Sequence, residues 1–162
     1  CRLDHFVDFR QANGLDLPFD DANFDMVWCQ NVTMNIEDKA AFYREIARVL
    51  KPGGRFTSTE MATGAVGPPH FPLPWARVPE ISFLVPQEDM RATLEAAGFR
   101  ILKWRDTSAE VIAAAQSQTK KARHSKLGVG LIAGADTPER VANSGRSLAE
   151  GRLANVMMVA EI

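Results

Sequence analysis

The chain has 162 residues, 46% of them hydrophobic and 24% charged, a balance typical of one globular domain with a sizeable core. The formal net charge of −1 excludes the broad basic surface of a nucleic-acid-binding protein. Cys1 and Cys29 offer neither a disulfide framework nor metal-ligand spacing, and no apolar run approaches the roughly 18 residues of a membrane span, so we expect a cytoplasmic protein without membrane or nucleic-acid partners.

The first third of the chain predicts two strands and a helix. Residues 5–10, HFVDFR, alternate as a short strand does, and the apolar residues 24–29 predict a second strand. Asn35 is a favourable N-cap for a helix that reaches about Leu50, with Asp38 completing a weak capping box. The segment Lys-Pro-Gly-Gly at 51–54 then ends this helix.

The remaining elements continue the alternation of strands and helices. Strands are expected at 55–61, 99–106 and 153–162, and helices at 87–97, 108–123 and from Thr137 onward. The intervening segment 62–86 is rich in proline and aromatic residues, and long ordered loops of this kind are usually functional. This order predicts an α/β sheet with helices on both faces.

Three stretches carry a resemblance to a known family. DLPFDDANFDMVWCQNVTMNI, FYREIARVLKPGGRF and SFLVPQEDMRATLEAAGFRILKW together resemble, in order, parts of the class I S-adenosylmethionine-dependent methyltransferases. Within that class the chain is similar to small-molecule enzymes of the sarcosine/dimethylglycine and ubiquinone/menaquinone-biosynthesis kind. The resemblance implies a Rossmann-like sheet with an antiparallel last strand, and S-adenosylmethionine as the cofactor.

The resemblance also implies where the cofactor binds. The end of the strand 24–29 would line the methionine part of S-adenosylmethionine with Cys29, Gln30 and Asn31, whose backbone carbonyls can accept from an ammonium group. A polar end on an apolar strand is itself typical of a ligand crevice in an α/β protein.

A second turn would hold the adenine ring. Asn13 stands where the family usually carries an acid, and its amide oxygen can accept the same hydrogen bond without a charge. Gly14 would let the backbone approach the ring, with Leu15 beside it in the same turn.

Candidate substrate contacts come from the proline-rich loop 62–86. His70 can orient a substrate, Trp75 can pack over a methylated ammonium, and Arg77 can pair with a carboxylate. Each has an ordinary alternative: a surface histidine, a loop-packing tryptophan and an exposed arginine. No catalytic side chain and no metal is expected, because methyl transfer from a sulfonium needs alignment and exclusion of water. The acceptor can be an amine, a carbon acid or a phenol.

The family's glycine-rich turn and first two strands are absent from these residues. We therefore expect residues 1–162 to form the carboxyl-terminal part of one methyltransferase domain, with 62–86 as a substrate-side loop and 108–152 as a helical insertion. The glycines at 128–134 are expected to form a loop, with a displaced cofactor turn as the alternative.

Without those strands, the strand 24–29 is expected to be an exposed edge that pairs with a second copy, forming a homodimer, or belongs to a larger protein. The alternative to an enzyme is a catalytically inactive truncated homologue that serves as a binding or oligomerisation module. Three further expectations concern single residues: Trp28 packs against a helix, Met34 lies in the core, and Glu60 faces the crevice or is partly solvated.

Overall fold

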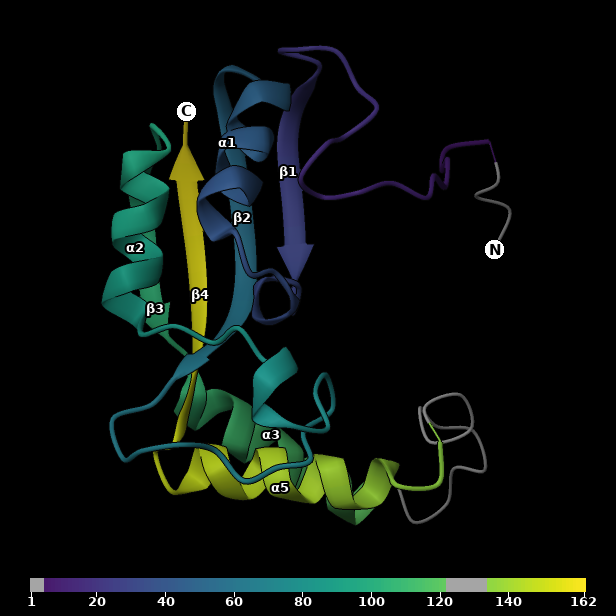
Figure 1. Cartoon of the computed structure of the whole chain (residues 1–162), viewed down its shortest axis with the longest axis vertical. Coiled ribbons are helices and arrows are strands. Elements are labelled where there is room, and N and C mark those ends of the chain that lie inside the picture. Colours follow the sequence, from purple (N-terminus) through teal and green to yellow (C-terminus); the bar gives the residue numbers. More distant parts are fainter. Residues whose placement is uncertain (1–4, 122–133) are drawn as a thin grey trace.

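The computed structural model describes residues 5–121 and 134–162, in which four strands form one mixed sheet (Figure 1). The strands lie in the order β1-β2-β4-β3. β1 and β2 are parallel, and β4 runs antiparallel to both of its neighbours. The strand bounds are β1 Phe24–Gln30, β2 Leu50–Thr63, β3 Arg100–Asp106 and β4 Leu153–Glu161.

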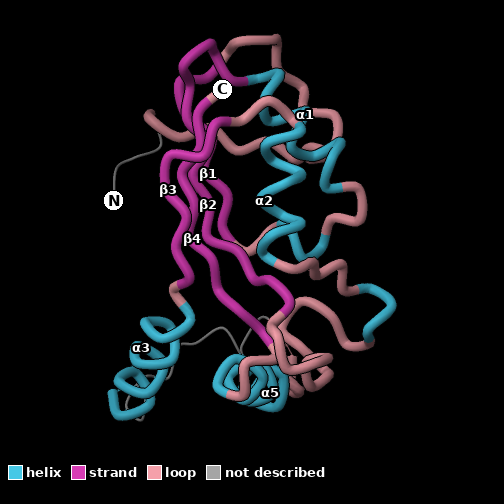
Figure 2. The backbone as a smooth tube through the Cα atoms, turned by 90° about the vertical axis from the view of Figure 1, so that its left-hand side faces the viewer, coloured by secondary structure: helices cyan, strands magenta, loops and turns pink. Residues whose placement is uncertain are grey.

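Helices α1 (Lys39–Val49) and α2 (Gln87–Ala96) cover one face of the sheet (Figure 2). Each presents an apolar stripe to the strands, as the helical spacing of its sequence predicts. The core between these layers contains Phe42, Tyr43, Ile46, Phe56, Met90, Leu94, Phe99, Val156 and Met158. Gly98 closes α2 in the left-handed region with φ +98°, which confirms the predicted helix end.

A second lobe lies beyond the carboxyl ends of β1 and β2 (Figures 1 and 2). It contains the short 3-10 helices η1 (Thr33–Asn35) and η2 (Pro79–Ile81), the helices α3 (Ser108–Lys121) and α5 (Thr137–Ala149), and the loop between β2 and α2. Its own buried cluster consists of Met34, Met61, Leu73, Leu148 and Leu153. The lobe therefore lies at the edge of the sheet where α/β proteins bind their ligands.

Three predictions about secondary structure are wrong. Residues 5–10 form no strand, and Phe6 and Phe9 are 84% and 90% exposed, because within the described residues no neighbouring strand pairs with them. Asn35 does not cap α1: Asp38 does, since its Oδ1 accepts from Ala41 N at 2.8 Å. Among the described residues, helices α1 and α2 cover one face of the sheet rather than both.

The antiparallel last strand is confirmed, and so are the strands near 24–29, 99–106 and 153–162. β2 begins earlier than expected, at Leu50, because the Lys-Pro-Gly-Gly segment continues into the strand. The loop predicted for the glycines at 128–134 falls mainly outside the described residues. No described helix combines the length and apolar character needed to cross a membrane.

Candidate functional site

The carboxyl tip of β1 lies beside β2 and turns sharply away from the sheet. Gln30 is in register with Thr59, and Asn31 N donates to Thr59 O at 2.9 Å. Asn31 has φ +55°, the left-handed region that few residues other than glycine and asparagine occupy. Gln30 and Asn31 are both exposed. The tip therefore presents two amide side chains at the ligand edge.

Beneath the tip lies the fully buried carboxylate of Glu60, which corrects the expectation that this residue faces the crevice or is partly solvated. Its Oε2 accepts from Val32 N, Thr33 N and Thr33 Oγ1, each at 2.9 Å. Its Oε1 accepts from Ser58 Oγ at 2.6 Å. The carboxylate therefore binds the segment that directly follows the tip.

Cys29 takes part in this tip through packing rather than through a reactive thiol. Its half-buried side chain packs against the main core, and its carbonyl accepts from Ser58 Oγ at 3.2 Å. Burial, with a smaller contribution from the negative charge of Glu60, raises the pKa of the thiol to about 12. The protonated thiol is therefore a poor nucleophile at neutral pH.

Two α1 side chains complete the surroundings of Glu60. Burial lowers the pKa of Lys39, whose Nζ donates to Ile36 O at 2.8 Å and to Phe83 O. Burial also raises the pKa of Tyr43, whose hydroxyl has no hydrogen-bond partner among the described residues. Lys39 thus ties the segment after η1 to the end of the loop between β2 and α2.

The predicted adenine turn is a compact structure of its own. Asn13 Oδ1 accepts from Leu15 N at 3.0 Å, and Asn13 O accepts from Asp16 N at 3.0 Å. Gly14 lies against α1, where an added Cβ would come within 3.1 Å of the Phe42 ring. The Asn13 oxygen therefore already holds one hydrogen bond, and its second lone pair remains for a ligand.

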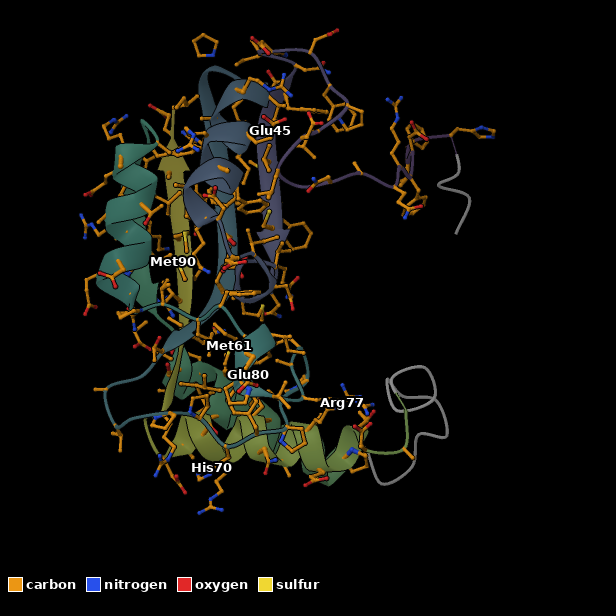
Figure 3. The ribbon with its side chains drawn as sticks, viewed as in Figure 1. Glu45, Met61, His70, Arg77, Glu80 and Met90 are labelled. Atoms are coloured by element: carbon orange, nitrogen blue, oxygen red, sulfur yellow. The ribbon has the colours of Figure 1, made fainter. Side chains whose placement is uncertain are left out.

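The segment after this turn is fastened to α1 by a charge pair that we did not predict. Arg48 Nη1 and Nη2 donate to Phe19 O at 2.9 Å and to Leu17 O at 3.1 Å. Glu45, labelled in Figure 3, accepts from Leu17 N at 2.7 Å and pairs with Arg48 at 2.6 Å. The i,i+3 spacing of Glu45 and Arg48 was the sequence signal for this pair, but nothing in it indicated the distant loop.

The three predicted substrate residues all hold the loop in place. His70 Nε2 lies 2.7 Å from Glu150 Oε2, and Arg77 pairs with Asp136 at 3.0 Å. These two acids flank α5, and Figure 3 shows His70 and Arg77 along that helix. Trp75 Nε1 donates to Ser82 Oγ at 3.0 Å within the loop. The ordinary reading of Trp75 as a loop-packing residue thus has a structural basis.

α5 binds this loop through a polar stripe. Arg140 Nη1 donates to Pro74 O and Asn143 Nδ2 to Pro72 O, each at 3.1 Å, while Ser147 Oγ accepts from His70 N at 2.9 Å. With Glu150, these residues recur every three or four positions and so lie on one helical face. This spacing is visible in the sequence, and we did not predict from it that the helix holds the loop.

An apolar cavity of about 400 Å³ separates α3 from α5. Its walls include Val111 and Ile112 of α3 and Val141 and Leu148 of α5, and Met61 contributes from the end of β2. Met61 lies near the carboxyl end of β2, so the cavity is at the same end of the sheet as the β1 tip. Its lining is predominantly apolar, which suits an uncharged organic group.

The structure groups the nine predicted site residues into three places. Cys29, Gln30 and Asn31 share the β1 tip. Asn13, Gly14 and Leu15 form the turn against α1, and His70, Trp75 and Arg77 belong to the loop over α5. None of the nine lines the apolar cavity.

The mixed sheet, with the antiparallel β4 between β2 and β3, has the fold of solved methyltransferase structures. Residues 1–58 match the family model described as "Methyltransferase domain". These findings confirm the resemblance drawn from the three sequence stretches.

Similar proteins of known sequence are also methyltransferases. The chain is 32% identical over 121 residues to O-methyltransferase resE of Aspergillus sclerotiorum, covering 72% of this chain and 44% of that protein. It is 30% identical over 142 residues to demethylmenaquinone methyltransferase of Clavibacter sepedonicus, covering 75% and 58% respectively. The chain thus spans about half the length of the curated relatives it matches.

A solved structure supports the fold. Geranyl diphosphate C-methyltransferase from Streptomyces coelicolor A3(2), in complex with Mg²⁺, geranyl diphosphate and S-adenosyl-L-homocysteine, superposes with a TM-score of 0.74 at 20% identity. The alignment covers 99% of this chain and 54% of that one. At this identity the likeness establishes the fold and no more.

Proposed function

We propose that this chain is the substrate-side, carboxyl-terminal part of a cytoplasmic S-adenosylmethionine-dependent methyltransferase that acts on a small molecule. The observation that carries the proposal is the amide-bearing tip of β1, which projects from a methyltransferase-type sheet at its ligand edge. The match of residues 1–58 to the methyltransferase family model supports it independently.

The residues of the tip suit the methionine end of the cofactor. Gln30 and Asn31 are exposed and uncharged, and amide groups can both donate and accept, as a zwitterionic ligand requires. Gly14 and Leu15, with the remaining lone pair of Asn13, would form part of the adenine site. The cofactor, when bound, supplies the electrophilic methyl group, while these residues orient it and exclude water.

The acceptor would enter from the second lobe. The apolar cavity between α3 and α5 is large enough for an uncharged organic group of moderate size, and the helical insertion 108–152 provides most of its walls. In this proposal His70, Trp75 and Arg77 act on the substrate side chiefly by fixing the loop that borders the site.

Calorimetric titration with S-adenosylhomocysteine tests the proposal, on the 162-residue chain and on the full-length gene product. We expect the full-length product to bind and to transfer a labelled methyl group to at least one acceptor in a panel of amines, carbon acids and phenols. Absence of binding by both proteins would refute the cofactor assignment.

A second candidate function is an inactive homologue that acts as a binding or oligomerisation module. The observation in its favour is the edge position of β1, where Met26 and Trp28 are 57% and 70% exposed. Exposed edges and apolar side chains favour association, here as a homodimer. Self-association of the full-length product without cofactor binding would support this second candidate.

A further inference from the structure

Glu60 binds four neutral donors, although it is fully buried. Three of them, Val32 N, Thr33 N and Thr33 Oγ1, contact the single oxygen Oε2, and Ser58 Oγ contacts Oε1. A buried carboxylate loses its hydration and is tolerated only when such donors replace it. A hydrophobic side chain of similar volume would leave the two backbone N–H groups without an acceptor.

The turn that Glu60 holds contains a backbone conformation that most residues avoid. Asn31 is in the left-handed region, which asparagine tolerates better than most residues with a side chain. Such conformations persist where the surroundings determine them from several sides. Here Asn31 N is bound to Thr59 O, and the next two N–H groups converge on Glu60.

We propose that Glu60 is a positioning residue whose buried carboxylate fixes the 31–33 turn and thereby the orientation of the exposed Gln30 and Asn31 amides. The inference rests on the proposed function, because it assigns those amides to the methionine end of the cofactor. Glu60 itself is fully buried and acts only through the turn. The neighbouring Lys39 donates to the carbonyls of Ile36 and Phe83, which lie outside the 31–33 turn.

A purely structural role for Glu60 predicts a different result from a positioning role. If Glu60 merely stabilises the fold, its removal should lower the free energy of unfolding, and cofactor affinity should fall no more than in another variant of equal stability. If it positions the turn, cofactor affinity and the protection of the amides at 31–33 should fall beyond what the stability loss explains.

The test uses the full-length gene product with Glu60→Ala, Glu60→Gln and Leu94→Ala. Leu94 is fully buried on α2, away from the turn, and its truncation typically costs 2–5 kcal/mol, so it controls for lost stability. We expect Glu60→Ala to weaken S-adenosylhomocysteine binding about tenfold or more, since each 1.4 kcal/mol is tenfold. Leu94→Ala should stay within about twofold of the parent under native conditions, because it leaves the turn intact.

Glu60→Gln supplies the rescue. Its amide oxygen can accept from Val32 N and Thr33 N while its NH₂ group donates to Ser58 Oγ, so most of the affinity and of the hydrogen-exchange protection should return. If Glu60→Ala does not fold, Thr33→Val removes one donor to Oε2 and should weaken binding by roughly threefold, a fraction of the contribution of one hydrogen bond to a carboxylate.

Equal affinity of Glu60→Ala and Leu94→Ala, with unchanged exchange at residues 31–33, would overturn the proposal. Where Glu60→Ala does not fold, unchanged binding and unchanged exchange at residues 31–33 in Thr33→Val would overturn it as well. If the parent protein fails to bind S-adenosylhomocysteine, the proposed function fails, whereas the exchange measurement still decides whether Glu60 holds the turn. The two failures are therefore distinguishable.

Discussion

The hydroxyl of Tyr43 is a buried polar group in an otherwise apolar core. Its side chain is fully buried between α1 and the sheet, and its hydroxyl has no partner among the described residues. An unsatisfied buried hydroxyl typically costs 1–3 kcal/mol. The ring packs against Phe42 and Phe56, with centroid distances of 5.7 and 6.1 Å, so the ring rather than the hydroxyl supplies the stabilising contacts.

Tyr43→Phe is therefore expected to raise the free energy of unfolding by about 1 kcal/mol, because the ring remains and the unsatisfied hydroxyl is removed. Urea unfolding of the variant and its parent measures the change. Phe42→Leu is a suitable comparison, since it removes aromatic packing without touching a polar group. A less stable Tyr43→Phe would show that the hydroxyl has a favourable partner.

Two glycines give a matched pair at the residue scale. A Cβ at Gly64 would lie 2.1 Å from Gly151 O, where two hydrogen-bonded backbone segments lie side by side, whereas a Cβ at Gly145 in α5 meets nothing within 4 Å. Gly64→Ala should therefore destabilise the protein by about 2–3 kcal/mol through forced backbone movement. Gly145→Ala should stabilise it by roughly 0.5–1 kcal/mol through helix propensity.

Chemical denaturation of the two alanine variants checks this pair. If Gly64→Ala leaves stability unchanged, the segment after β2 and the segment before β4 pack less tightly than the structure shows. A destabilising Gly145→Ala would mean that the α3–α5 interface has no room for a methyl group at this position.

At the scale of elements, the attachment of the loop to α5 depends on Glu150. Hydrogen bonds from His70 first, then from Arg146 and Arg152, lower the pKa of Glu150 to about 2 from an ordinary value of 4.5. Because the folded-state pKa is depressed, the stabilisation is complete above pH 4.5 and is lost as the pH falls toward 2.

The difference in melting temperature between the parent and Glu150→Gln should consequently be constant from neutral pH to about pH 5 and then shrink as the pH falls further. His70→Ala should move this loss to higher pH, since it removes the largest cause of the shift. A difference in melting temperature that stays unchanged down to pH 2 would show that the interactions of Glu150 with His70, Arg146 and Arg152 do not stabilise the fold.

At the scale of the whole molecule, helices cover one face of the sheet (Figure 2), and β1 and β3 form its two edges within residues 5–121 and 134–162. α1 and α2 cover one side of the sheet (Figure 2). β1 lies at an edge, and its Met26 and Trp28 are exposed. The expectation that Trp28 packs against a helix is thus wrong, because it points to the face that α1 and α2 do not cover. Met34, by contrast, is 3% exposed and confirms its predicted core position.

The exposed strand gives a prediction about association. The 162-residue chain should self-associate, and the double variant Met26→Lys/Trp28→Lys should reduce association, because charges on an edge strand oppose pairing. Sedimentation velocity measures the association state of the unmodified chain and of the double variant. A well-folded monomer of the unmodified chain would contradict this prediction. A lysine substitution at the exposed Val78, which lies outside β1 and outside the apolar cavity, provides a control.

Much of the fold was predictable because its signals are local. Apolar runs indicated β1, β3 and β4, helical spacing indicated α1 and α2, and Gly98 marked the end of α2. The segment 5–10 has the same local pattern as a strand and still forms none, since a strand exists only where a neighbour accepts its hydrogen bonds. Asn35 likewise had the chemistry of an N-cap, but the adjacent turn bound to Glu60 places it in η1 instead.

The site was predictable only in part, for a related reason. The polar end of β1 follows from the order of residues along one strand, so Gln30 and Asn31 could be identified from the sequence. The partners that organise it are remote: Glu60 lies 27 residues from Thr33, and Glu150 lies 80 residues from His70. Burial of a carboxylate and the pairing of a loop with a helix depend on which distant segments come into contact in the folded chain. The hydrophobic pattern of the sequence does not specify those contacts.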